Sequence, residues 1–332
     1  MDVALLKKYA NSLTNEKLRL IILPTEDCNF RCSYCWENFN HGIMSPENVE
    51  AIKVLLTNRA KGLKLLEIEW FGGEPLVAKD IVFDISDHIR QLKTEYPQLV
   101  YRGAMTTNGY LLNLKTSGRL CESGIKEYRI VLDGTEKFHD ATRKLANGGG
   151  TFNIIWDNLV ALKKSDLDFS IRLNINFLLN NYSQAVPPLL QLINKTFQGD
   201  NRFFLFFKAV QRLGGKNDCL IEKVNREEEN LIIDELCRLV ETQKVIRYVP
   251  KNDVCFAAEL NTMVIRANGD INKCVIALKD ECNNVGKLNT DGTMTIDQQK
   301  FLNWSKGFDP LDELYLRCPY KVIKSVSEIQ KV

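Results

Sequence analysis

The chain has 332 residues, which is long for one compact core and favours a large domain joined to a smaller one. Its hydrophobic content of 45%, charged content of 26% and net charge of +2 are those of an ordinary globular protein. The sequence has no basic block that would indicate a nucleic-acid partner, and its apolar runs are too short to span a membrane.

The N-terminal residues, from Met1 to Ser12, lack the apolar core of a secretory signal peptide. We therefore expect a cytoplasmic protein. That compartment keeps thiols reduced, so the ten cysteines are better explained as metal ligands or buried apolar residues than as disulfides.

Strand-like and helix-like segments alternate as far as residue 210, and this alternation predicts βα units around a parallel sheet. About six such units fit, so the expected fold is α/β, a partial (β/α)6 barrel of the TIM type. The expected strands are Leu18–Leu23, Leu65–Phe71, Val100–Thr106, Tyr128–Leu132, Phe169–Phe177 and Arg202–Phe207, and the expected helices include Pro46–Lys61 (with Ser45 as its cap), Asp80–Thr94 and Thr151–Lys164.

Unusual loops follow the first four expected strands. In a parallel sheet such loops share one edge, where chemistry usually gathers. In chain order they contain Cys28, Gly72-Gly73-Glu74, Thr107-Asn108-Gly109 and Asp133-Gly134.

The composition changes after the barrel. A charged helical stretch is expected from Glu222 to Lys244, and Asn268-Gly269-Asp270 predicts a hairpin turn. We expect a domain boundary near residue 250. The expected divisions are an N-terminal extension (1–17), the partial barrel (18–215), a helical linker (216–250) and a small C-terminal domain (251–332).

Three cysteines, Cys28, Cys32 and Cys35, form a C-x3-C-x2-C motif in one loop. Thiolates suit zinc and iron–sulfur clusters, but structural zinc requires a fourth ligand, and only His41 lies near in sequence. A cubane cluster accepts three ligands and leaves one iron open. A zinc knuckle or three buried cysteines are the alternatives.

This motif, with Tyr34 before its last cysteine, resembles that of the radical SAM superfamily, and W-F-G-G-E-P at 70–75 is similar to that family's G-G-E motif. The resemblance implies that the three cysteines bind a [4Fe–4S] cluster whose open iron is chelated by S-adenosylmethionine. Reductive cleavage then gives a 5′-deoxyadenosyl radical that removes a hydrogen atom from substrate. Backbone at Gly72 and Gly73, with Glu74, is implied to contact the methionine amino group.

Two further segments, T-T-N-G-Y at 106–110 and V-L-D-G-T-E-K-F-H-D-A-T-R at 131–143, look like those of the peptide-modifying branch. The likeness suggests that Arg143 pairs with the methionine carboxylate and that Asp133 faces the substrate. Surface solvation or loop capping explains these residues about equally well, and His139 and Asp140 are candidates for capping the next helix. The remaining candidate cofactor-binding residues are Tyr34, Asn108, Asn174 and Asn176.

The C-terminal region resembles the start of a SPASM or twitch domain, through the G-x4-C pattern that ends at Cys274. Tyr315 stands where the partner of Cys318 in a C-x2-C pair would be, so the full two-cluster SPASM pattern is excluded. One auxiliary cluster held by Cys255, Cys274 and Cys318 remains, with an open iron or with Cys282 as fourth ligand. A degenerate domain without a second cluster is the alternative.

We therefore predict a radical SAM enzyme that modifies a ribosomally made precursor peptide by cross-linking, thioether formation, epimerisation or excision. The alternatives are a sulfatase-maturase-like oxidase that forms formylglycine, a small-molecule radical SAM dehydrogenase and a non-catalytic scaffold. The expected partners are the peptide, a reductase such as flavodoxin or ferredoxin, and a separate leader-binding protein, with neither nucleic acid nor membrane.

Overall fold

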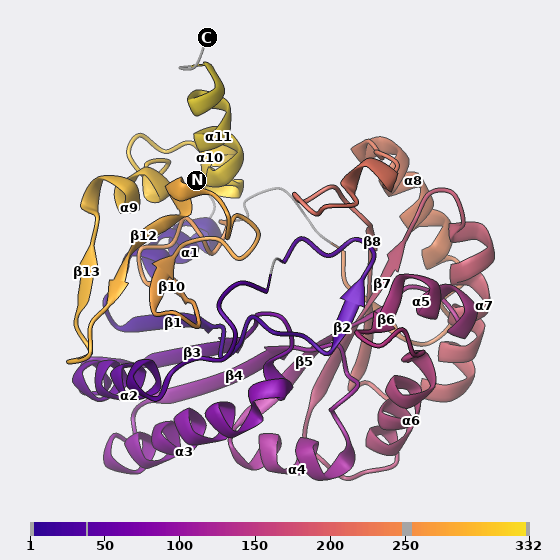
Figure 1. Ribbon diagram of the computed structural model, residues 1–332, viewed down its shortest axis with the longest axis horizontal. Helices are drawn as coiled ribbons and strands as arrows, with labels where there is room; N and C mark the ends of the chain where they lie inside the picture. The colour runs from indigo at the N-terminus through magenta and orange to yellow at the C-terminus, as the bar shows by residue number, and fades with distance from the viewer. Residues whose placement is uncertain (1–2, 38, 248–253, 330–332) are drawn as a thin grey trace.

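The computed structural model describes residues 3–37, 39–247 and 254–329 (Figure 1). Its centre is a set of six parallel strands, each paired with the next along the chain. They are β1 (Lys17–Ile22), β3 (Leu65–Trp70), β4 (Val100–Thr106), β5 (Ile125–Leu132), β7 (Ser170–Phe177) and β8 (Phe203–Ala209). The six strands expected from the sequence are confirmed, and the fold is the expected partial barrel.

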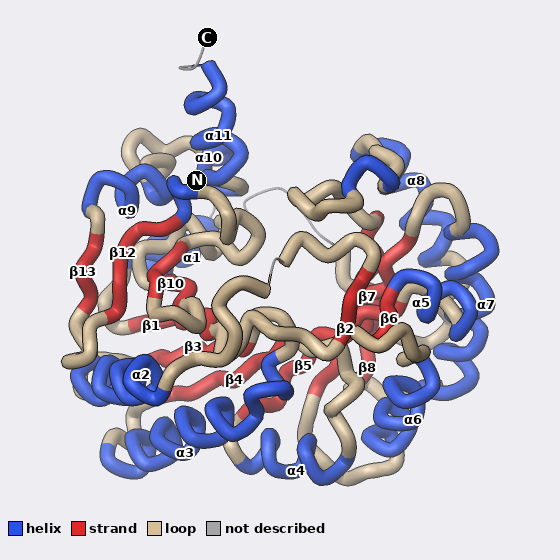
Figure 2. The backbone as a smooth tube through the Cα atoms, viewed as in Figure 1, coloured by secondary structure: helices blue, strands red, loops and turns tan. Residues whose placement is uncertain are grey.

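Helices lie along the outside of these strands (Figures 1 and 2). The first begins after Ser45, whose side chain accepts a hydrogen bond from the Asn48 amide, as expected of a cap. The outer helices are α2 (Pro46–Ala60), α3 (Lys79–Glu95), α4 (Leu114–Glu122), α6 (Phe152–Lys163), α7 (Tyr182–Phe197) and α8 (Arg226–Cys237). The short α5 (Glu136–Thr142) precedes α6.

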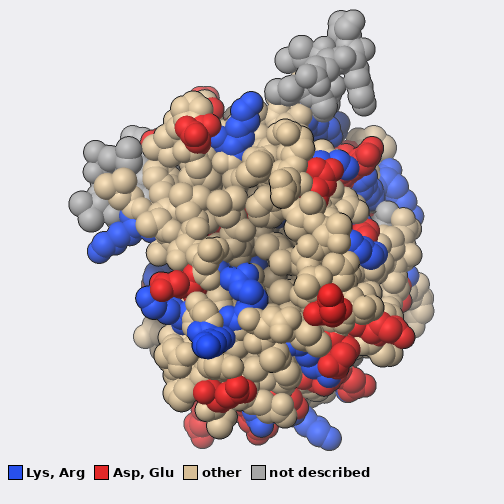
Figure 3. All heavy atoms as spheres, turned by 90° about the vertical axis from the view of Figure 1, so that its left-hand side faces the viewer, with Lys and Arg blue, Asp and Glu red and all other residues tan. Residues whose placement is uncertain are grey.

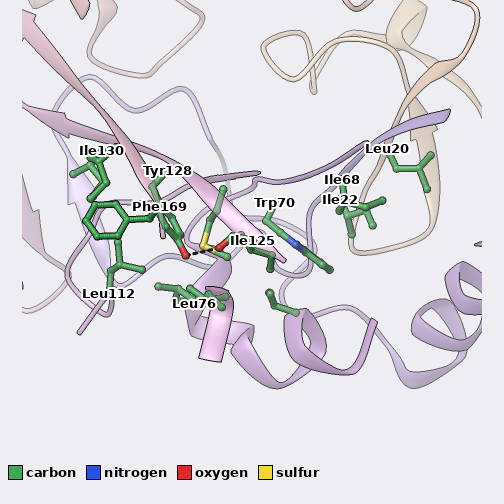
Figure 4. Packing of buried hydrophobic residues seen from close by; sticks show 14 of the residues in the cluster. Leu20, Ile22, Ile68, Trp70, Leu76, Leu112, Ile125, Tyr128, Ile130 and Phe169 are labelled. Carbon is green, nitrogen blue, oxygen red and sulfur yellow. Dashed lines mark hydrogen bonds between the residues drawn. The ribbon is translucent and has the colours of Figure 1, made fainter. Parts of the chain in front are cut away.

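Side chains alternate between two environments along each barrel strand. In β7, Ile171, Leu173, Ile175 and Phe177 are buried, and the residues between them are half-buried. The buried set packs with the helices, and Figure 4 shows part of this core, where Trp70 and Ile68 of β3 lie near Ile22 of β1. The other set faces the interior of the barrel, so polar residues there are available to a ligand.

The C-terminal strands extend the barrel sheet. β10 (Thr262–Ile265) pairs in parallel with β1, and β11 (Asp270–Asn272) returns through the expected turn, where Gly269 has φ of +84°. β12 (Asn284–Leu288) and β13 (Met294–Ile296) follow antiparallel, and β9 (Lys244–Val245) pairs with β8 at the other edge. The resulting sheet of 11 strands runs β13-β12-β11-β10-β1-β3-β4-β5-β7-β8-β9.

The two ends of the described chain meet. The helix α1 (Val3–Leu13) places Tyr9 edge-on against Phe308, beside Leu316 of α10 (Glu313–Arg317). The other C-terminal helices are α9 (Gln298–Ser305) and α11 (Pro319–Ile329). Basic and acidic side chains both occur across the face drawn in Figure 3, scattered among neutral ones.

One expected element is shorter than predicted. The helix expected over Glu222–Lys244 is α8, which ends at Cys237. The chain then turns because Asn194 and Gln243 form hydrogen bonds that join residues 239–243 to α7, and Lys244–Val245 becomes β9. The boundary expected near residue 250 lies outside the described residues. Within the described part, no helix is both long and apolar enough to cross a bilayer.

Candidate active site

The cysteine loop follows β1 and is held by a short two-stranded sheet. In that sheet, β2 (Phe30–Cys32) pairs antiparallel with β6 (Arg143–Leu145), which places Cys32 opposite Arg143. The Cys35 amide donates a hydrogen bond to the Cys32 carbonyl at 3.2 Å. The three cysteines of the motif therefore lie in one short loop, which is held by its pairing with β6.

The thiols of this loop are half-buried, and backbone donors point at them. The Phe30 amide donates to Cys28 Sγ at 3.3 Å, and Asn108 Nδ2 lies 3.9 Å from the same sulfur. Burial raises the pKa of Cys28 to about 12 and that of Cys35 to about 11. A metal ion must therefore displace these protons, as thiolate ligation generally requires.

These residues fit a cluster better than a single ion. Among the described residues, no three His, Cys, Asp or Glu side chains are close enough to hold one metal ion together. A four-iron cluster is wider, because each of its thiolate ligands binds a different iron. Three half-buried thiols spread around one loop match that donor arrangement.

The Gly72-Gly73 pair packs directly on the backbone that precedes Cys28. A Cβ at Gly73 would lie 2.3 Å from the Asp27 carbonyl oxygen, and one at Gly72 would lie 2.3 Å from that of Thr25. Gly72 also has φ of +116°, which favours glycine. The family resemblance implies that this backbone contacts the methionine amino group. The contacts found here are between the two glycines and the backbone of residues 25–27.

Glu74 lies under the same loop, fully buried. Its carboxylate accepts hydrogen bonds from Thr107 Oγ1 at 2.8 Å, from the Asn108 amide at 2.7 Å and from the Leu76 amide at 3.1 Å. It thereby ties the loop after β3 to the loop after β4. Asn108 continues the chain of contacts through Nδ2, which donates to Asn29 Oδ1 at 2.8 Å.

A buried polar network joins the cysteine loop to the loop after β5. The Tyr34 hydroxyl lies 2.8 Å from both carboxylate oxygens of Asp133, and Arg143 Nη1 donates to that hydroxyl at 2.9 Å. Thr142 Oγ1 donates to Asp133 Oδ2 at 2.6 Å, and Asn176 Nδ2 lies 3.5 Å from the Tyr34 oxygen. The structure therefore brings four sequence-predicted residues, Tyr34, Asp133, Arg143 and Asn176, into one network.

In and beside the cysteine loop, three buried polar atoms have no hydrogen-bond partner within the part of the chain that the structure describes: Arg143 Nε, Trp36 Nε1 and Glu37 Oε1. Buried polar groups are rarely left unpaired, so these atoms are suited to contact a ligand. Trp36 and Glu37 were not singled out from the sequence, although they directly follow Cys35.

Asn174, Asp140 and His139, the other candidates from the sequence, lie in different surroundings. Asn174 on β7 accepts a hydrogen bond from Arg172 Nε at 2.9 Å inside the barrel. Asp140 caps α6, as suggested, because its Oδ1 accepts from the Thr151 and Phe152 amides. His139 is buried in α5 and accepts a hydrogen bond from the Asp133 amide through Nδ1.

Tertiary contacts bring the segments that carry three of the C-terminal cysteines near one another. The Cys255 amide donates to the Leu316 carbonyl at 2.8 Å, two residues from Cys318. Burial raises the pKa of Cys274, and the nearby Cys318 raises it further. Asn283 holds Cys274 by accepting from its amide and donating to its carbonyl, each at 2.8 Å.

A cleft of about 610 Å³ lies between the cysteine loop and the C-terminal region. Its walls are formed by Trp36 and Glu37, by segments that follow β8 and by the segments around Ile276–Asp280 and Cys318–Lys324. The cleft therefore opens directly onto the end of the cysteine motif.

The fold and this loop define a barrel enzyme built around a thiolate-bound iron–sulfur cluster. Residues 22–183 match the family model described as the Radical SAM superfamily. A GTP 3′,8-cyclase of Clostridium perfringens (strain SM101 / Type A) is 26% identical over 303 residues, 83% of this chain and 86% of that protein. A cysteine-type anaerobic sulfatase-maturating enzyme of Clostridium novyi (strain NT) is 25% identical over 231 residues, 67% and 59% of the two chains.

Solved structures share the fold. Native anSMEcpe with bound AdoMet and Cp18Cys peptide superposes with a TM-score of 0.63 at 19% identity, covering 88% of this chain and 82% of that one. Streptococcus suis SuiB bound to precursor peptide SuiA gives 0.56 at 19% identity, covering 88% and 66%. Residues 22–183 therefore form a radical SAM domain, and the cofactors of this enzyme are a [4Fe–4S] cluster and S-adenosylmethionine.

Proposed function

We propose that this enzyme modifies a peptide, as a maturase of a ribosomally synthesised precursor. The observation that carries the proposal is the cleft of about 610 Å³, which is lined by both the end of the cysteine loop and the C-terminal region. Support also comes from anSMEcpe and SuiB, which share the fold and whose structures hold peptides. An extended peptide binds such a surface through its backbone and through side-chain pockets.

In this proposal Cys28, Cys32 and Cys35 hold the cluster. When bound, the cluster and S-adenosylmethionine together supply a carbon radical that removes a hydrogen atom from the substrate. The unpartnered Arg143 Nε is a donor suited to the methionine carboxylate. Asn108 orients the cysteine loop through Asn29, and Glu74 positions Asn108 rather than contacting the ligand with its own carboxylate.

Asp133 has a different role from that expected. Its carboxylate accepts from Tyr34 and Thr142, so we assign it to positioning Tyr34 beside the cysteines. Asn174 and Asn176 face the barrel interior and are suited to hydrogen-bond the ribose or the substrate.

We further propose one auxiliary cluster in the C-terminal region. Cys255, Cys274 and Cys318 are the ligands that the contacts favour, because Cys318 acts on Cys274 and the Cys255 amide binds the Leu316 carbonyl two residues from Cys318. Cys282, the fourth candidate, is held by its main chain, because its carbonyl accepts a hydrogen bond from Trp304 Nε1 at 3.0 Å. A reductase and a leader-binding protein complete the proposed system.

A second candidate is chemistry on a nucleotide, favoured by the GTP 3′,8-cyclase that matches 83% of this chain. One experiment separates the two. Anaerobically reconstituted enzyme is given dithionite, S-adenosylmethionine and either candidate precursor peptides or GTP. A change in peptide mass, or deuterium uptake from heavy water in the case of epimerisation, together with 5′-deoxyadenosine formation that depends on the peptide supports a maturase. Turnover of GTP without any peptide turnover would assign the chain to the second candidate.

A further inference from the structure

The barrel interior carries more positive than negative charge around Glu69 of β3. Arg19 of β1 places Nη2 2.7 Å from Glu69 Oε2, and Arg129 of β5 donates to Glu69 Oε1. Two guanidinium groups therefore share one carboxylate. Glu67 and Glu259 also act on Arg19, so Arg129 is the guanidinium group that depends on Glu69 alone for an ion pair among the described residues.

Arg172 of β7 adds a further positive charge at the same level, and it feels Glu69 only from beyond ion-pair distance. The strand register places it directly beside Arg129. Its Nε donates to Asn174 Oδ1 at 2.9 Å, and its guanidinium lies 5.0 Å from the centre of the Phe206 ring. Across the described ranges, no carboxylate lies within ion-pair distance of Arg172, and its two Nη groups have no acceptor.

The surroundings of Arg172 disfavour its charged form, and its pKa shows this. Burial, with the neighbouring charge of Arg129, lowers the pKa of Arg172 to about 10. A guanidinium whose charged form is disfavoured by its surroundings gains most from an added anion. The geometry already provides two free Nη donors on the lumen side for that anion.

Arg172 lies deeper in the barrel than the cysteine loop. Asn176, four residues further along the same strand, is the residue that approaches Tyr34. Four strand residues span about 13 Å, so a ligand at the strand ends lies between the cysteines and Arg172. The anion expected at Arg172 is therefore not the methionine carboxylate, which Arg143 at the strand ends is placed to bind.

We propose that Arg172, supported by Arg129, binds a carboxylate of the peptide substrate, so that an acidic residue lies beside the position that is modified. This inference rests on the proposed function and specifies its substrate class. The charge balance favours a carboxylate over a nucleoside triphosphate. Four cations (Lys17, Arg19, Arg129 and Arg172) face three carboxylates (Glu67, Glu69 and Glu259), so the excess positive charge is about one, against a triphosphate charge of about four. Phe206 provides an apolar wall for the stem of an acidic side chain.

The test compares two blocked tripeptides, N-acetyl-alanyl-glutamyl-alanine amide and its glutaminyl counterpart. Each is titrated calorimetrically into reconstituted enzyme that carries S-adenosylmethionine, with GTP as a third titrant. We expect the glutamyl peptide to bind about tenfold more tightly than the glutaminyl one, because a charge-assisted pair replaces a neutral one. Arg172→Gln should remove this preference, and Arg172→Lys should keep part of it.

Arg90→Gln is the matched control, because Arg90 is an exposed arginine on α3 whose ion pair within the described residues is with Asp87, at 3.8 Å. It should keep the full preference. Equal binding of the two peptides, or no binding of the glutamyl peptide, overturns the inference. A dissociation constant for S-adenosylmethionine that rises as much as that of the peptide in Arg172→Gln would place the guanidinium on the cofactor and also overturn it. GTP binding that depends on Arg172 overturns it too.

The two proposals fail in different ways. If peptides are modified but the acidic and neutral tripeptides bind equally, only the carboxylate inference is wrong. If no peptide is turned over in the reaction assay, the proposed function is wrong.

Discussion

Two regions of this chain gather cysteines, and they do so by different means. Cys28, Cys32 and Cys35 lie within one loop, which the backbone of 72–74 and strand β6 hold in place. Cys255, Cys274 and Cys318 are spread over the C-terminal region and meet only because strand pairing and helix packing bring them together. Ligands in one loop need little of the fold to be adjacent, whereas separated ligands depend on all of it.

The largest effect should come from the first region. Replacing Cys28, Cys32 or Cys35 by Ala removes one of three ligands from a cluster that has no spare, so 5′-deoxyadenosine formation with dithionite should fall to background. The control is Cys219→Ala, because Cys219 is exposed and lies outside both groups. Deoxyadenosine production that survives in a purified single variant would exclude the proposed ligand set.

Iron content tests the C-terminal cysteines once the three cysteines of the first loop have been replaced. In a Cys28/Cys32/Cys35→Ala triple variant, we expect about four iron atoms per chain to remain, one cubane's worth. Adding Cys274→Ala should remove them. Iron and sulfide analysis after anaerobic reconstitution gives the count, and a triple variant without iron would show that the C-terminal cysteines hold no cluster.

The packing of glycine on the cysteine loop provides the next prediction. Gly73→Ala should destabilise the protein by about 1–3 kcal/mol and lower its iron content, because the new Cβ meets the Asp27 carbonyl. Gly118→Ala is the matched control. Gly118 lies within α4, where a Cβ meets nothing within 4 Å, so alanine should stabilise the protein by about 0.5–1 kcal/mol.

Thermal midpoints and iron content measured together decide the outcome. If Gly73→Ala keeps its iron and its stability but binds S-adenosylmethionine more weakly, then the glycine serves the ligand, as the sequence alone had suggested. If iron content and the thermal midpoint fall together, Gly73 is needed for the packing of the cysteine loop.

Glu74 tests how strongly the two loops are coupled. Glu74→Gln replaces one acceptor oxygen by a donor that faces the donors of Thr107 and Asn108, so we expect a loss of about 1–3 kcal/mol. Glu127→Gln on the exposed side of β5 should change stability by less than about 0.5 kcal/mol. Thermal unfolding of both variants beside wild type makes the comparison, and equal midpoints would argue against Glu74 as a brace.

The sequence predicted the barrel and the first cysteine site because both depend on local signals. Alternating βα units and a tight three-thiol motif are each readable over short windows. The contacts of Glu74, and the network of Tyr34, Asp133 and Arg143, join residues 33 to 109 positions apart. No local pattern encodes such pairs, so the sequence could name these residues as candidates but could not predict which of them contact one another.

The same limit applies to the helix expected over Glu222–Lys244. Its composition favours a helix throughout, but α8 ends at Cys237, and hydrogen bonds to Asn194 and Phe197 redirect the chain toward β9. Tertiary contacts therefore override local propensity there. Arg172 could not be recognised from the sequence either, because an arginine in a strand gives no sign of whether an acidic residue lies within ion-pair distance.

The smallest effect concerns His139, which is buried beneath the loop of Asp133. Burial, with the charge of Arg143, holds the pKa of His139 well below its usual value, so the folded protein keeps it neutral. The unfolded chain binds a proton there below about pH 6.5, so stability should fall with falling pH by up to about 1.4 kcal/mol per unit. His139→Gln lacks this titration, and its thermal midpoint should therefore fall less than that of wild type between pH 7.0 and pH 5.5. Parallel midpoints in the two proteins would mean that His139 is already protonated in the fold. The added proton would then lie on Nδ1, which accepts the hydrogen bond from the Asp133 amide and would have to give that bond up.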